Sequence, residues 1–139
     1  MKRTLIAALL VFATLLVSAP ALSIAAPPSV EERVATAEMV FVGKLINRIE
    51  VEGDWVHAEL QVTEPLLKAK VGEKVPVTWR LVRFNDAVIF DCQEGKQGVA
   101  ILGDMHQGRY WLRDDKFLSM DLLDDIKKAV EKVTKTEKP

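Results

Sequence analysis

The sequence predicts a small, mainly β domain in which about five short strands curl into a barrel, with a short helix before them and an amphipathic helix after them. Apolar and polar residues alternate through residues 55–63, the pattern of a strand with one buried face. A glycine interrupts the apolar run at residues 39–43, as expected where a strand bends. Apolar residues recur at helical spacing at residues 30–37 and 121–133.

The start of the chain has the layout of a secretory signal. Lys2 and Arg3 precede an apolar run over residues 4–17. The run is shorter than the ~20 residues that a membrane span needs, so we interpret it as a cleaved leader and not as an anchor. We therefore expect residues 1–25 to be removed as a signal peptide. The remaining residues 26–139 are expected to form one domain, exported to the periplasm or outside the cell, with no stable membrane span.

The charge balance argues against a nucleic-acid partner. Loss of Lys2 and Arg3 leaves 17 of the 19 basic residues against 20 acidic ones, a net charge of −3. Nucleic acid requires a concentrated basic surface. The lysines over residues 127–138 are interleaved with acidic residues, as on the solvated face of a helix.

A short helix over residues 30–37 is expected to open the domain. Ser29 and Glu32 match the capping box, in which a serine hydroxyl accepts a hydrogen bond from the backbone amide three residues further on. Apolar residues at i, i+4 and i+7 give this helix one apolar face.

Three strands are expected to follow the helix. The first begins in the apolar run at residues 39–43, and a turn with Gly53 joins it to the second strand at residues 55–63 as an antiparallel hairpin. Pro65 is expected to end the second strand, because proline cannot donate to a strand ladder. A third strand is predicted over residues 75–82.

The second half of the chain adds two strands and a helix. Residues 84–98 read as a loop with a short apolar patch at 87–90, and strands are predicted at 99–102 and 110–112. The helix over 121–133 has acidic residues in its first turn and lysines later, which complements its dipole. We expect this helix to pack on the sheet. Together the elements suggest a five-stranded barrel of the OB type, with a two-layer α+β sheet as the alternative.

Three segments carry a resemblance to a known family. They are residues 36–45 (TAEMVFVGKL), residues 65–72 (PLLKAKVG), and Cys92 with residues 98–102 (GVAIL). They resemble the tissue-inhibitor-of-metalloproteinases-like, or netrin-module, OB domains of exported bacterial proteins, and the resemblance spans residues 36–113. It implies an OB-like fold. It does not imply protease inhibition. Those inhibitors chelate the zinc of the protease through an N-terminal cysteine, whereas the mature chain here is expected to begin at Ala26.

Cys92 is the single cysteine, so the chain cannot form an internal disulfide, a CxxC pair or a zinc cage of several cysteines. Three interpretations stay open: a buried thiol, an intermolecular disulfide that links a dimer, and a reactive nucleophile. A nucleophile would need His106 and an acid such as Asp91 or Asp104. The candidate catalytic residues are therefore Cys92, His106 and Asp104.

The other polar motifs predict neither a metal site nor a cofactor. His57 and Glu59 share the polar face of the second strand, but two ligands do not complete a metal site. The glycines at positions 95 and 98 have no helix after them, unlike a phosphate loop.

The chain has three tryptophans, Trp55, Trp79 and Trp111. Two of them begin or lie within strands at alternating positions, and we interpret these as core residues. The alternative is an aromatic face that binds an extended ligand, as on some OB-type barrels.

We expect a non-enzymatic exported β-barrel module that binds a protein, a peptide or an envelope component through its loops. A small thiol-dependent enzyme that uses Cys92 and His106 is the alternative. A purely structural envelope protein is a third interpretation. The oligomeric state is left open.

Overall fold

The structure is a computed structural model, and it describes residues 28–137. The strands are β1 (Met39–Val51), β2 (Trp55–Leu67), β3 (Lys74–Arg80), β4 (Arg83–Phe84), β5 (Ala87–Val88), β6 (Gln97–Leu102), β7 (Met105–His106), β8 (Arg109–Trp111) and β9 (Phe117–Leu118). The helix α2 (Val30–Thr36) precedes them, and a 3-10 turn η2 (Met120–Leu122) and the helix α3 (Leu123–Glu137) follow. The expected signal peptide at residues 1–25 lies outside the described residues.

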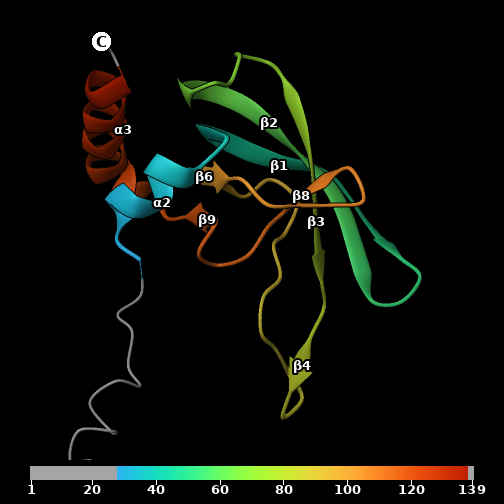
Figure 1. The fold of residues 1–139 in the computed structure, drawn as a ribbon. Coiled ribbons are helices and arrows are strands. Elements are labelled where there is room, and N and C mark those ends of the chain that lie inside the picture. The colour runs from blue at the N-terminus through green and yellow to red at the C-terminus, as the bar shows by residue number, and fades with distance from the viewer. Residues whose placement is uncertain (1–27, 138–139) are drawn as a thin grey trace, which may run out of the picture.

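Seven of the strands form one curled sheet, a half-barrel with the order β7-β8-β3-β2-β1-β6-β9 (Figure 1). All its strand pairs are antiparallel except β3 and β8, which run parallel. The prediction of a mainly β domain with a helix at each end is confirmed, but the sheet has seven strands instead of five. The additional strands β7 and β9 have two residues each, too few for an alternating pattern to appear in the sequence.

The first helix begins where the sequence predicts. The hydroxyl of Ser29 accepts from the backbone N–H of Glu32 at 3.2 Å, and Val34 on the inner side of α2 is buried. This serine cap satisfies an amide that has no partner within the helix.

The pairing of β1 with β2 confirms one expectation and corrects another. The register shifts between Val42 and Gly43, which is the predicted bend. Pro65 does not end β2, which continues to Leu67. The ladder between β2 and β3 extends only as far as Gln61, so the missing N–H of Pro65 leaves no hydrogen bond to β3 unmade.

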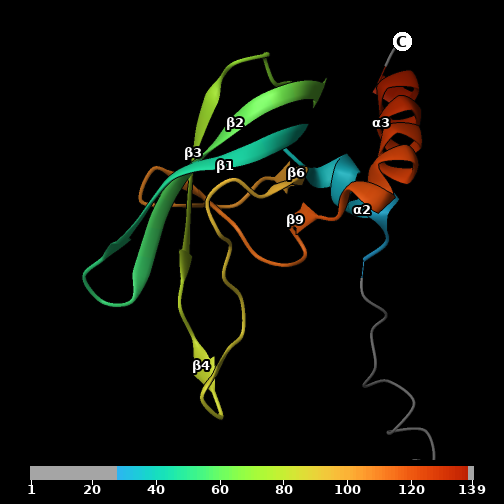
Figure 2. The same ribbon diagram turned by 180° about the vertical axis from the view of Figure 1, so that it is seen from behind.

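Two apolar clusters hold the fold together. One fills the inside of the curl and includes Phe41, Leu60 and Trp79. The other lies between the sheet and the helices, where Val42 of β1 and Ile126 of α3 are both buried. The helix α3 therefore packs on the sheet, as predicted, and it lies beside α2 at one end of the molecule (Figures 1 and 2).

A separate two-stranded hairpin, β4 and β5, projects downward from the sheet in both views, away from α3 (Figures 1 and 2). Its turn residues Asn85 and Asp86 have φ angles of 51° and 64°, the left-handed values of a two-residue hairpin turn that asparagine and aspartate tolerate. This hairpin includes part of the apolar patch noted at residues 87–90. No helix within the described residues is long and apolar enough to cross a membrane.

Candidate functional site

Cys92 lies in the core and not in a site. Its side chain is 1% exposed and belongs to the cluster inside the curl, together with Trp79 and Leu112. Its sulfur lies 3.9 Å from the carbonyl oxygen of Gln93, a weak hydrogen bond. Burial raises the pKa of the Cys92 thiol. A raised pKa keeps the sulfur protonated, the opposite of what a nucleophile requires.

Asp91 is committed to a hydrogen-bond network next to this cysteine. Its carboxylate accepts from the Arg48 guanidinium at 2.9 and 3.0 Å, from the Trp79 indole N–H at 3.1 Å and from the Cys92 backbone N–H at 2.8 Å. Burial alone would raise the pKa of Asp91, but these hydrogen bonds lower it overall. The network ties the loop after β5 to β1 and β3.

His106 belongs to an aromatic cluster on the outer face of the sheet. Its ring stacks on Trp55 with centroids 4.6 Å apart and planes 7° apart, and Trp111 lies 5.1 Å from His106 and 5.3 Å from Trp55. Within residues 28–137, no histidine acts on the Cys92 thiol by hydrogen bond or by charge. Asp104 is exposed, and its backbone carbonyl accepts a hydrogen bond from the backbone N–H of Trp111 at 2.8 Å.

The structure confirms the core interpretation for one tryptophan only. Trp79 is buried, as expected, but Trp55 and Trp111 are half-buried on the outer face. Trp55 lies on the same face of β2 as His57, which is the partly exposed face, whereas Val56 lies on the buried face. The alternation along the strand therefore already places Trp55 outside the core.

A small pocket of about 160 Å³ brings His57 and His106 together, which sequence spacing does not indicate. Arg109 also lines it, and its guanidinium donates to the carbonyls of Ala58 at 3.1 Å and Val77 at 3.3 Å. Burial and then the charge of Arg109 lower the pKa of His57. His57 is therefore a neutral ring at pH 7.

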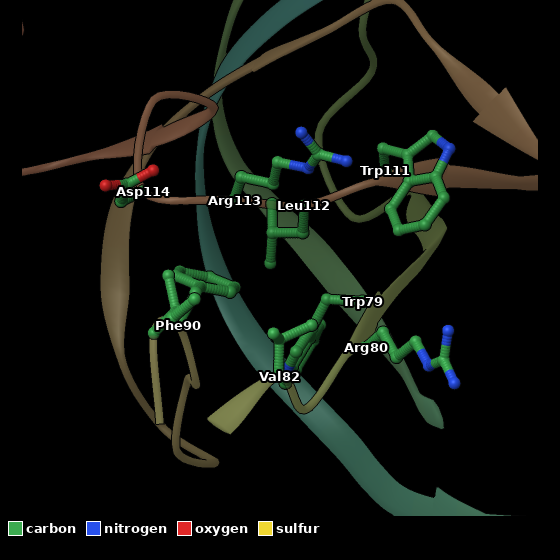
Figure 3. A pocket seen from close by; sticks show the side chains of 9 residues that line it. Trp79, Arg80, Val82, Phe90, Trp111, Leu112, Arg113 and Asp114 are labelled. Atoms are coloured by element: carbon green, nitrogen blue, oxygen red, sulfur yellow. The ribbon is translucent and has the colours of Figure 1, made fainter. Parts of the chain in front are cut away.

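A larger cavity of about 430 Å³ opens between the loop after β8 and the base of the β4–β5 hairpin. Its lining residues are Trp79, Arg80, Val82, Ile89, Phe90, Trp111, Leu112, Arg113 and Asp114. Figure 3 shows Val82, Phe90 and Leu112 around the same space, which we call the hairpin cavity. The ring of Trp79 meets that of Phe90 edge-on with centroids 5.7 Å apart. This size and apolar lining are typical of ligand pockets.

The hairpin extends the apolar lining of this cavity into solvent. Phe84 pairs with Ala87, and the Ile89 N–H donates to the Val82 carbonyl at 2.9 Å. Residues that pair across an antiparallel ladder point to the same side, so Val82, Phe84 and Ile89 share one side of the hairpin, its apolar face. These three side chains are 47%, 69% and 65% exposed.

Two arginines border the hairpin cavity next to the aromatic cluster. The guanidinium carbon of Arg80 lies 6.0 Å from the ring centroid of Trp55, and that of Arg113 lies 5.1 Å from Trp111. Both arginines are exposed, and neither has a carboxylate within 4.0 Å among the residues that the structure describes. In Figure 3 they point to the same side as Trp111, with Asp114 on the other side.

The sequence contains one signal for this site, the apolar patch at residues 87–90 inside a polar loop. Phe84 and Ile89 become functional candidates only when the Asn85-Asp86 turn pairs their strands. Arg80 and Arg113 are distant in the chain, so no local sequence pattern marks them. The parallel pairing of β3 with β8 brings both arginines to one cavity.

No metal-binding group was found in the described range, meaning no set of three or more His, Cys, Asp or Glu side chains placed to hold an ion. Glu59, the neighbour of His57 on β2, accepts instead from the side-chain amide of Asn47 at 2.7 Å. Comparison with protein-family models and with curated protein sequences finds no match to this chain.

Proposed function

We propose that this protein is a non-enzymatic binding module that holds a protein, peptide or envelope component against the hairpin cavity and the apolar face of the β4–β5 hairpin. The observation that carries this proposal is that the hairpin cavity and the apolar face of the hairpin form one continuous surface. Val82 and Ile89 line the cavity and also belong to the exposed side of the hairpin with Phe84. An exposed apolar patch that continues into a cavity is typical of an interaction site.

The rigidity of the cavity wall supports binding. Trp79 is fixed by its hydrogen bond to Asp91, and the Arg48 guanidinium holds the same carboxylate. A site that is already formed loses less conformational entropy when its ligand arrives. The network around Asp91 therefore serves the binding surface, by holding the loop that carries Phe90.

The thiol-enzyme alternative gains no support from the geometry. Cys92 is buried with a raised pKa, Asp91 is occupied by Arg48, and His106 is stacked on Trp55. A nucleophile needs a base within hydrogen-bond reach and a path for substrate.

We also propose that the fold is OB-like and related to the exported netrin-module domains. The order β8-β3-β2-β1-β6, with β3 and β8 parallel, supports this proposal, since an OB barrel is a five-stranded, partly open barrel. On this view β7 and β9 are short extensions of that barrel.

Export is the remaining part of the proposal, and it rests on the sequence of residues 1–25. We expect the protein recovered from its host to begin at Ala26, in the periplasm or the medium. Mass spectrometry of the C-terminally tagged chain tests this directly. Finding residues 1–25 still attached would show that the leader is not removed.

The binding proposal is tested by capturing partners from the host envelope with the tagged full-length chain and two variants. Phe84→Ser removes an apolar side chain from the hairpin, and Val71→Ser removes one that is 72% exposed outside this surface. We expect one partner to be retained by the wild type and by Val71→Ser but lost with Phe84→Ser. Equal retention by all three proteins would contradict the proposal.

A further inference from the structure

We infer that the occupant of the hairpin cavity is an extended peptide segment of a partner protein, with a large apolar side chain flanked by carboxylates. This inference rests on the proposed binding function and adds the chemistry of the ligand. It is drawn from three features of the surface: its apolar depth, its unpaired positive charge and its free strand edges.

The apolar anchor follows from the cavity. Phe90, Leu112 and Val82 surround a space of about 430 Å³, and the apolar face continues from Val82 to Phe84 outside it. A small ligand would be covered by the cavity alone and would leave the hairpin exposed. A longer segment covers both, with one large side chain in the cavity and smaller apolar contacts along the hairpin.

The flanking carboxylates follow from charge. Among the lining residues, Arg80 and Arg113 outnumber the single acid Asp114. Each arginine is ordered against a tryptophan ring without a carboxylate partner in the described structure. A guanidinium held in this way presents a planar pair of donors that matches a carboxylate. Arg113 also lines a neighbouring pocket beyond Trp111, whose other charged residues are Lys116, Asp104 and Asp115.

The extended conformation follows from the hairpin edges. In the part of the chain that the structure describes, β4 and β5 pair with each other and with no third strand. An unpaired edge offers backbone N–H and C=O groups to an incoming strand. A peptide that adds to this edge places alternate side chains on the same side as Val82 and Phe84.

A display library of random peptides, selected on the tagged full-length protein, tests the inference directly. We expect enrichment of sequences in which an aromatic or large aliphatic residue has Asp or Glu on both sides. Arg80→Glu and Arg113→Glu should each weaken the binding of an enriched synthetic peptide about fivefold, the range of an exposed ion pair. Exchanging both of its acids for lysines should restore binding to the double variant Arg80→Glu/Arg113→Glu.

Arg83→Glu is the matched control, because Arg83 is exposed but points to the opposite side of the hairpin from Phe84. It should leave the affinity unchanged, and all three variants should keep the wild-type thermal unfolding midpoint. Enrichment of basic or uncharged sequences, or equal weakening by Arg83→Glu, would overturn the inference.

Two other outcomes also overturn the inference while leaving the proposed function intact. In one, no peptide is enriched although the envelope partner is still captured in a Phe84-dependent way, so that the contact is not a peptide segment. In the other, sedimentation shows a dimer that Phe84→Ser abolishes, so that a second copy occupies the surface. If neither peptide nor partner depends on Phe84, the binding function itself fails.

Discussion

Single residues decide which chemistry this molecule can perform. Cys92 and Asp91 are neighbours in the sequence and resemble parts of a thiol site. In the folded chain, the thiol is buried and the carboxylate binds Arg48 and Trp79. Asp91 holds Trp79 in the wall of the hairpin cavity, and Cys92 packs in the core cluster behind it.

The first prediction concerns the thiol. Because Cys92 is 1% exposed and its pKa is raised by burial, native protein at neutral pH should react with a thiol reagent far more slowly than free cysteine. Cys92→Ser should cost about 1 to 2 kcal/mol of unfolding free energy, because a hydroxyl is buried in an apolar cluster, and it should leave partner binding unchanged. Labelling as fast as that of the urea-unfolded chain would show that the thiol is accessible.

The second prediction concerns Asp91, whose pKa is lowered in the folded state from an ordinary value of 3.8. At acid pH the unfolded chain binds the proton first, so this residue contributes stability above about pH 4 that is lost as the pH falls through the lower folded pKa. Asp91→Asn should cost about 2 kcal/mol at pH 7, because the Arg48 guanidinium loses its nearer carboxylate at 2.9 Å and keeps only the exposed Glu50 at 3.7 Å.

Urea unfolding of both proteins at pH 7 and pH 3 measures this contribution. The difference between wild type and Asp91→Asn should shrink at the lower pH, because Asp91 of the unfolded wild-type chain is then largely protonated. A difference that stays constant over this range would contradict the assigned role of Asp91.

At the scale of elements, the curl of the sheet depends on close approach between strands. Gly98 of β6 pairs with Gly43 of β1, and a Cβ atom at Gly98 would lie 2.8 Å from the carbonyl oxygen of Leu118 in β9. Backbone cannot move aside as cheaply as the end of a flexible side chain. Gly98 therefore lets β9 come close to β6.

The third prediction compares two glycine substitutions. Gly98→Ala should lower the unfolding free energy by about 1 to 3 kcal/mol, the usual cost of overpacking. Gly103→Ala should change it by less than about 0.5 kcal/mol, since its nearest contact would be an ordinary 3.6 Å. Urea denaturation measures both, and equal losses would show that β9 does not press on Gly98.

Long elements were predictable from the sequence and short ones were not. The alternation along β2 and the helical spacing of α3 each extend over many residues, so the buried faces with Leu60 and Ile126 were found correctly. Strands such as β7 and β9 form through tertiary pairing and leave no periodic signal. Thr78 shows a similar limit. Its alternation with Val77 and Trp79 predicts a place on the polar face of β3, but Thr78 is buried and its hydroxyl donates to the Val56 carbonyl at 2.9 Å.

The candidate site was less predictable than the fold for a physical reason. Its arginines and tryptophans come from β2, β3 and the β8 region, and they meet only because the sheet curls and β8 pairs parallel to β3. Sequence spacing carries no information on such a meeting. The small-pocket pair of His57 and His106 arises in the same way.

At the scale of the whole molecule, the two ends of the domain have different tasks. The helices α2 and α3 close the apolar cluster at one side of the sheet, and the β4–β5 hairpin projects downward from the sheet, away from α3 (Figures 1 and 2). The hairpin thus presents an exposed apolar surface away from the helices. This arrangement supports the proposal that the hairpin takes part in binding.

The most direct test of this account is site-specific photo-crosslinking of the full-length chain in its host, with a photoreactive residue at Phe84 or, as the control, at Val71. Both side chains are exposed and apolar, but only Phe84 lies on the proposed surface. We predict a discrete adduct of one mass from position 84, lost when Trp111→Ala is added, and none from position 71. No adduct at position 84, or the same adduct from both positions, would contradict the claim that the hairpin and its cavity form the binding site.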